Sequence, residues 1–191
     1  MTGYRVTGFS MLETMVAAMV FAFGAIGATG MQILATEANH EAMYRTRAVY
    51  LATDLIERLR DNPEGLETYD SSADNLWRIV GSHSISKEPE PDCVSTSCTP
   101  QQLATHDLWA WEQVLDGKDV YREGVSATGG LPSPTGCIRY LGDGQVELAI
   151  AWFGRRSMSN AILATSCTVA DRYGNQDEYR RVLYLRTYLS Q

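Results

Sequence analysis

The pattern of hydrophobic and polar positions predicts a membrane-spanning helix at the N-terminal end. The first eight residues are polar, and the chain is then apolar from Phe9 to Ala35, with Glu13 as the one charged residue in this run. Residues 15–34 provide about the 20 residues that a helix needs to cross the hydrocarbon core of a bilayer. We therefore expect residues 9–35 to be the membrane segment.

The same helix is predicted to continue beyond the apolar run with one apolar stripe. Apolar side chains recur there at three- and four-residue steps, with polar residues between them. The stripe consists of Tyr44, Ala48, Leu51, Leu55 and Leu59. Asn62-Pro63 ends the run, because proline disfavours a helical residue before it. One helix is thus expected from Phe9 to Asp61, with an amphipathic half at residues 36–62.

A second, shorter helix is predicted from Thr99 onward. Thr99 suits the N-cap, Pro100 the first turn, and Gln102 closes a capping box. The helix is expected to reach Leu115, and its apolar stripe consists of Ala104, Leu108, Trp111 and Leu115. Trp109 and Trp111 are interpreted as packing residues rather than as a binding site.

The last third of the chain predicts strands. Residues 137–141, 145–153 and 180–189 have strand patterns, and residues 64–91 are expected to be a connecting loop with a short strand at 76–80. An antiparallel sheet with one apolar face needs a covering layer, which the amphipathic half of the long helix supplies. The predicted fold class is α+β, with a globular head at residues 63–191.

Four cysteines lie in the C-terminal half, and an even number suits disulfides in an oxidising compartment. Proximity favours a Cys93–Cys98 pair, and expected neighbouring strands favour a Cys137–Cys167 pair, although four cysteines allow three pairings. A zinc site is the alternative, but no second close cysteine pair follows the first. We predict no metal.

Charge and motifs exclude several classes of function. The net charge of −7 argues against a nucleic acid partner. The sequence contains no nucleophile elbow, zinc-protease helix, phosphate loop or dinucleotide motif, so we predict no catalytic residues and no cofactor. The scattered His40, His83 and His106 are expected to be surface residues.

Acidic and amide residues in the C-terminal loops are a further candidate for metal binding. They are Asp143, Asp171, Asn175 and Asp177. Such groups can build a calcium site, but the preferences of turns explain them more simply.

The start of the apolar run has a specific motif. Gly8-Phe9-Ser10-Met11-Leu12-Glu13 resembles the class III leader of type IV pilins and type II secretion pseudopilins, in which glutamate is the fifth mature residue. The resemblance implies that a prepilin peptidase removes residues 1–8 by cutting after Gly8 and that the new amino group of Phe9 is methylated. An ordinary secretory signal cut near Ala28 and a plain anchor are the alternatives.

Glu13 has a physical role in this interpretation. A carboxylate in hydrocarbon needs a cationic partner or a proton, and the amine of a neighbouring subunit's Phe9 would be that partner. The competing explanation places Glu13 at headgroup depth, where the helix dipole favours an acid.

The middle of the chain is similar to minor pilins of the PilV type. The similarity rests on Asp61-Asn62-Pro63, on the run from Cys93 to Pro100, on residues 104–111 and on Trp152. It implies a subunit held in the inner membrane with a periplasmic head, which joins other minor pilins and the major pilin in the pilus fibre. A secretion pseudopilin and an unrelated anchored periplasmic protein remain the alternatives.

Overall fold

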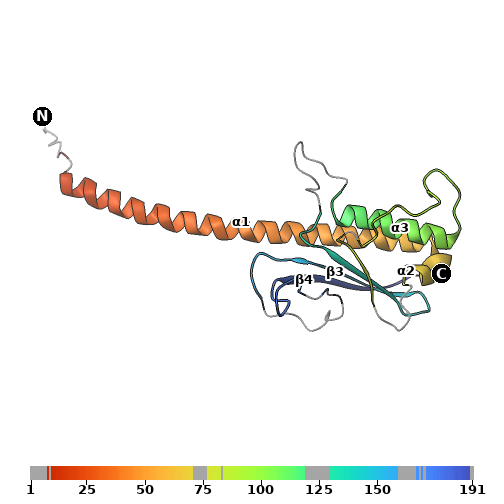
Figure 1. Ribbon diagram of the computed structural model, residues 1–191. Helices are drawn as coiled ribbons and strands as arrows, with labels where there is room; N and C mark the ends of the chain where they lie inside the picture. The colour runs from red at the N-terminus through yellow and green to blue at the C-terminus, as the bar shows by residue number, and fades with distance from the viewer. Residues whose placement is uncertain are drawn as a thin grey trace, which may run out of the picture. The chain divides into compact units, whose positions relative to one another are not determined.

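The fold is seen in a computed structural model, which describes residues 8, 10–70, 77–82, 84–118, 130–158, 167, 169 and 171–189 (Figure 1). In chain order the elements are α1 (Met11–Asp61), the 3-10 turn η1 (Pro63–Gly65), α2 (Leu66–Tyr69), β1 (Arg78–Val80), α3 (Pro100–Leu115), β2 (Thr135–Tyr140), β3 (Gln145–Phe153) and β4 (Arg180–Tyr188). The chain divides into residues 1–42 and residues 43–191, so α1 contributes to both units.

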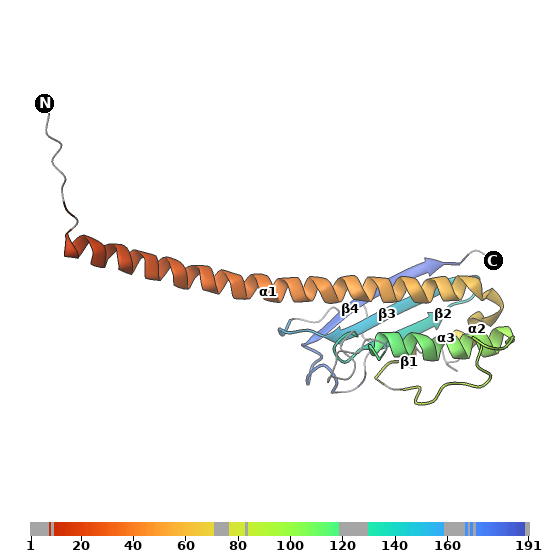
Figure 2. The ribbon, with the colours of Figure 1, turned by 90° about the horizontal axis from the view of Figure 1, so that it is seen from above.

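The second unit is built on a four-stranded antiparallel sheet in the order β1-β2-β3-β4. Alternation along β3 directs Val146, Leu148, Ile150 and Trp152 to one face, where all four are buried. The C-terminal part of α1 and all of α3 cover this face (Figure 2). The predicted α+β architecture, with a long helix on an antiparallel sheet and one additional short helix, is confirmed.

The core of this unit contains both predicted helical stripes. Ala48, Leu51, Leu55 and Leu59 of α1 are buried, and so are all four stripe residues of α3. Trp111 of α3 contacts both α1 and β2. Its indole Nε1 donates to the Leu51 carbonyl of α1 at 2.9 Å, and its ring lies against Gly136 of β2. A side chain at Gly136 would clash with that ring, so this position needs glycine for close approach.

The opposite face of β3 is also covered, which the alternation did not predict. Ala149 and Ala151 are fully buried there beside Cys137, Cys167 and Tyr173. The cover comes from the segment before β4, which the Cys137–Cys167 disulfide ties to β2. The Tyr173 hydroxyl fixes it further by hydrogen bonding to Thr135 Oγ1 at 2.7 Å. Burial on both faces explains why β3 is the most apolar strand.

One part of the predicted loop at residues 64–91 is wrong. The chain turns through η1 directly after Asn62 and then forms α2, whose Leu66 and Tyr69 are buried. Both side chains pack into the core of the second unit. The four residues of α2 are too few to show a helical period, so the sequence pattern could not indicate it.

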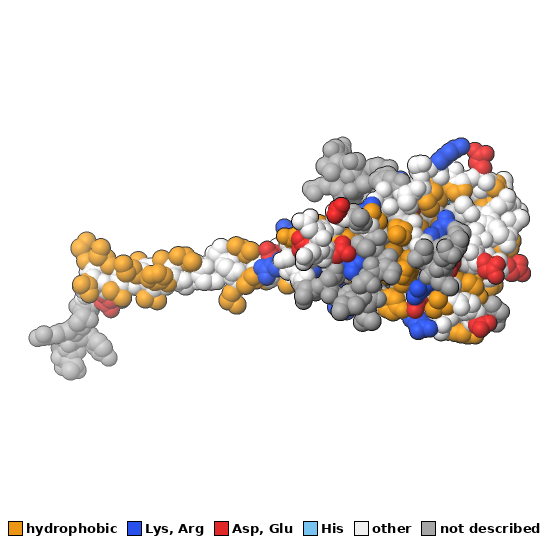
Figure 3. Space-filling view, turned by 60° about the horizontal axis from the view of Figure 1, so that its bottom comes forward, with side chains coloured by type: hydrophobic (Ala, Val, Ile, Leu, Met, Phe, Trp, Pro, Cys, Tyr) orange, Lys and Arg blue, Asp and Glu red, His pale blue; other side chains and the backbone are white. Residues whose placement is uncertain are grey.

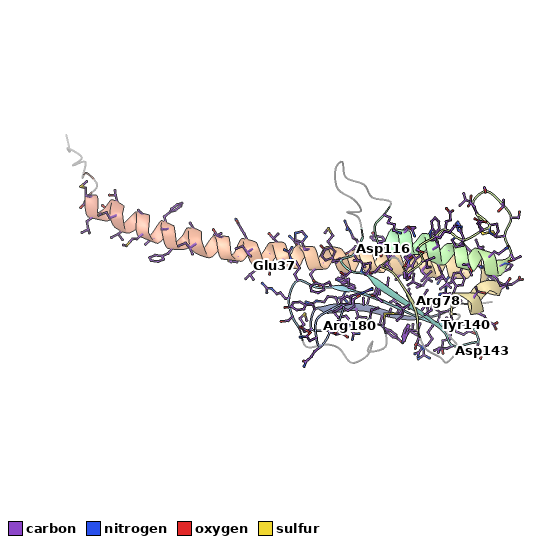
Figure 4. The ribbon with its side chains drawn as sticks, in the orientation of Figure 1. Glu37, Arg78, Asp116, Tyr140, Asp143 and Arg180 are labelled. Atoms are coloured by element: carbon purple, nitrogen blue, oxygen red, sulfur yellow. A yellow bond between two sulfur atoms is a disulfide. The ribbon has the colours of Figure 1, made fainter. Side chains whose placement is uncertain are left out.

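Hydrogen bonds join α2 and the residue after it to the first two strands. Arg78 of β1 donates to the Thr68 carbonyl at 3.3 Å, and the Tyr140 amide of β2 donates to the Asp70 carboxylate at 2.8 Å. Figure 4 shows Arg78 and Tyr140 near this end of the sheet. The short helix therefore closes one end of the core.

Candidate assembly segment and head contacts

The first unit contains a helical segment whose apolar side chains are exposed and have no cover from the other residues that the structure describes. Every described residue from Ser10 to Thr36 is exposed, including Met11 at 88%, Phe21 at 78% and Phe23 at 74%. Figure 3 shows apolar side chains gathered along this part of α1. A soluble surface rarely exposes so much contiguous apolar area, so the segment is built for lipid or for other protein chains. Among the described residues, α1 is the one helix long and apolar enough to cross a membrane.

The few hydroxyl groups in this segment are satisfied by its own backbone. Thr14 donates to the Met11 carbonyl at 2.8 Å, and Thr29 donates to the Ala25 carbonyl at 2.9 Å. Such bonds remove the need for water at these positions, as a helix in hydrocarbon requires. Thr14 and Thr29 are therefore compatible with a membrane.

Glu13 lies in the first turn of α1, at the edge of the apolar run. Ser10 begins the helix: its carbonyl accepts from the Glu13 amide at 3.0 Å, and its hydroxyl accepts from the Leu12 amide at 3.3 Å. These bonds use backbone groups, and the Glu13 carboxylate is exposed without a hydrogen bond or ion pair to another described residue. Gly8 is described and exposed, whereas Phe9, the expected site of methylation, lies outside the described residues.

The glycines of this segment leave room on the helix surface. An added side-chain carbon at Gly24, Gly27 or Gly30 would meet no other atom within 4 Å. No contact among the described residues therefore requires glycine at these positions.

The C-terminal end of α1 is fastened to α3 by buried polar groups. Arg58 pairs with Asp54, one helical turn earlier, at 3.1 Å and with Asp107 at 3.2 Å. The Tyr69 hydroxyl donates to the other oxygen of the Asp107 carboxylate. Burial, together with this bond to an acid, raises the pKa of Tyr69, so the phenol stays protonated. Asn62 completes the network by donating to the Pro100 carbonyl at 2.8 Å.

Glu112 holds the loop after β1 against α3. The side chain is fully buried, and Oε1 accepts from the amides of Gly81 at 2.9 Å and Ser84 at 2.7 Å. Oε2 accepts from the Ile85 amide at 2.8 Å. One carboxylate thus accepts the hydrogen bonds of three loop amides. Sequence reasoning missed this role because Glu112 lies outside the apolar stripe of α3.

A second carboxylate, Glu147, organises charges on the other face of the sheet. It accepts hydrogen bonds from Arg139 and from the Tyr184 hydroxyl, the latter at 2.7 Å. Burial tends to raise its pKa, but these bonds and the charge of Arg139 outweigh burial and lower the pKa. The Arg139 guanidinium also lies 4.8 Å from the centre of the Trp77 ring. We interpret this cluster as side-chain contacts between neighbouring strands that stabilise the sheet, rather than as a catalytic site.

The cysteines form disulfides in the pairs Cys93–Cys98 and Cys137–Cys167. No cysteine is free, so the alternative of a cysteine-ligated zinc site is wrong. The first disulfide closes the loop before α3, and the second joins β2 to the segment before β4.

The loop acids occupy turn positions. Asp143, Asp171 and Asp177 have positive φ angles, a conformation that aspartate tolerates better than most residues. Asp177 also lies 3.4 Å from the Arg180 guanidinium. Within the described ranges, none of these acids belongs to a group of three His, Cys, Asp or Glu residues close enough to hold a metal ion.

One expectation about the histidines is wrong. His106 is only 7% exposed, whereas the scattered positions of the histidines had predicted surface residues. His40 is half-buried on α1, and His83 lies outside the described residues. The burial of His106 arises because the loop before α3 folds over that helix.

In comparison with known proteins, part of the chain matches a protein family. The family described as Type IV pilin Tt1218 matches residues 30–109, which extend from within α1 through β1 to α3. The proteins of this family are structural and non-catalytic, and the fold agrees with a type IV pilin fold. No curated protein and no solved structure matches the chain. The leader motif and Glu13 lie outside the matched residues.

Proposed function

We propose that the chain is a non-catalytic minor pilin of the type IV pilus. The observation that carries this proposal is the first part of α1, an exposed apolar helix whose Glu13 carboxylate pairs with no other described residue. The match of residues 30–109 to a type IV pilin family supports it independently of the leader motif. Assembly with other pilins would cover the apolar surface that the single chain leaves exposed.

Processing would create the partner of Glu13. A prepilin peptidase would cut after Gly8, and the methylated amine of Phe9 would be the new N-terminus. Two unit charges about 4 Å apart attract each other by about 4 kcal/mol at an intermediate effective dielectric. The pairing of Glu13 with the Phe9 amine of a neighbouring subunit would therefore set the axial register of subunits as they leave the inner membrane.

The proposal that the chain is a minor rather than a major pilin rests on features of the second unit. A disulfide-bearing loop before α3 and the similarity to PilV-type minor pilins at residues 61–63, 93–100, 104–111 and 152 favour this class over a major pilin. Such a subunit would hold its head in the periplasm before assembly and join other minor pilins to prime the fibre, at its tip. It would thereby support twitching motility and adhesion.

The test is recovery of the chain in surface filaments. Filaments are sheared from cells that produce pili and from cells of the same strain that lack the major pilin, and the chain is detected with an antibody to residues 43–191. The proposal predicts a substoichiometric amount of the chain, present only with the major pilin. Recovery with type II secretion components instead would assign the chain to the pseudopilins, which share the leader motif.

A further inference from the structure

Three side chains with metal-binding atoms meet where the loop after β1 packs on α3. His106 Nε2 lies 3.9 Å from the Glu88 carboxylate and 3.8 Å from the Asp92 carboxylate. The ligand atoms of all three residues lie within 4.8 Å of one another. The cluster is confined to the second unit.

His106 points a buried nitrogen into this cluster. Its side chain is 8% exposed, and Nε2 has no hydrogen-bond partner among the described residues. The ring also lies beside the Trp109 ring, with the two ring centres 5.6 Å apart. A buried polar atom without a partner costs free energy, and one aimed at two carboxylates needs a cation or a proton between them.

The Asp92 side of the cluster is held in place by its own loop. Asp92 Oδ1 accepts from the Val94 amide at 2.9 Å, and the Asp92 carbonyl accepts from the Thr96 amide at 3.0 Å. The Cys93–Cys98 disulfide closes the same turn. These contacts fix the position of the Asp92 side chain beside His106.

We propose that Glu88, Asp92 and His106 bind a divalent transition-metal cation, with Zn²⁺ as the best match. One imidazole nitrogen and two carboxylate oxygens are a ligand set that zinc accepts, with water in the fourth position. Magnesium and calcium prefer oxygen ligands alone, so the histidine selects against them.

Metal binding would draw the ligand atoms together from the 3.8 and 3.9 Å that separate His106 from the carboxylates and from the separation of at most 4.8 Å between the carboxylates. Ligands at zinc distances of about 2.1 Å in a tetrahedron lie about 3.4 Å apart. The Glu88 and Asp92 side chains are 49% and 46% exposed, so they can move inward by the few tenths of an ångström that the His106 distances require. The bound cation would fasten the disulfide-bearing loop to α3.

This site is independent of the pilin assignment. The prediction of no metal considered the cysteines and the C-terminal loop acids, not these three residues together, which have no recognised spacing in the sequence. Only the packing of the loop on α3 brings positions 88, 92 and 106 together. A competing explanation is a protonated imidazolium paired with the two carboxylates, which would need no metal. The experiment distinguishes the two.

The experiment measures Zn²⁺ binding to the untagged full-length chain in detergent micelles after treatment with a chelator. Isothermal titration with zinc chloride is followed by elemental analysis of the protein after gel filtration. We expect one Zn²⁺ per chain, and we expect Glu88→Gln and His106→Gln to weaken binding at least about tenfold. His40→Gln is the matched control and should bind as the unchanged chain does.

Glu88→Gln keeps the test decisive if the buried His106 variant fails to fold, because the Glu88 side chain is half exposed and keeps its size in the substitution. Absence of zinc binding by the unchanged chain would overturn the site and leave the imidazolium pairing. Undiminished binding by Glu88→Gln, or loss of binding in His40→Gln, would also overturn it.

Discussion

Glu13→Ala is expected to leave the chain in the membrane and to remove it from sheared filaments. The substitution makes the apolar run more hydrophobic, so insertion keeps its driving force. It deletes the one carboxylate in this run that could pair with the Phe9 amine of a neighbouring subunit. An unpaired amine in an apolar filament core is costly, so incorporation should fall at least about tenfold. Membrane and filament fractions of the same cells are compared by immunoblotting.

Two variants control for this result. Glu13→Gln keeps the shape of the side chain and removes its charge, so it should fail to assemble as Glu13→Ala does. Glu41→Ala removes an acid from the same helix beyond the apolar run and should assemble normally. Normal incorporation of both Glu13 variants would show that the carboxylate does not set the register.

Trp111→Ala is expected to destabilise the second unit by about 4 kcal/mol. The indole is fully buried, so its removal leaves a large cavity between the helices and the sheet. It also leaves the Leu51 carbonyl without the hydrogen bond from Nε1. Denaturant unfolding followed by near-ultraviolet circular dichroism, in detergent, measures the change in the free energy of unfolding of this unit.

Trp109→Ala is the matched control, two residues away on α3. Trp109 is half-buried and rests on His106 rather than filling the core, so its loss should cost about 1 kcal/mol. Equal losses of stability in the two variants would contradict the placement of Trp111 at the junction of α1, α3 and β2. Neither substitution touches the first part of α1, so both variants should still insert into membranes.

The sequence predicted those parts of the fold that local rules determine. Pro63 ended α1 where the structure ends it, and the capping box of Thr99 and Gln102 begins α3. The alternation from Gln145 to Phe153 predicted β3 with the observed bounds. In each case a residue's own backbone preference or a period of several residues is enough to identify the element.

The parts that sequence reasoning missed depend on contacts between distant segments. Glu112 is buried by a loop some thirty positions earlier in the chain. Its carboxylate accepts hydrogen bonds from the Gly81 and Ser84 amides of that loop. The second covered face of β3 arises because the Cys137–Cys167 disulfide brings a later segment over it. Neither leaves a periodic signal, since the partners are loop residues with no pattern of their own.

The measurement that tests the central claim most directly is the mass of the mature N-terminus. The chain is isolated from membranes of cells that contain the prepilin peptidase, and its N-terminal peptide is sequenced by mass spectrometry. If the chain is a processed pilin, the peptide begins at Phe9 and carries one added methyl group. A peptide that begins at Met1 or near Ala28 would contradict the pilin assignment and, with it, the role proposed for Glu13.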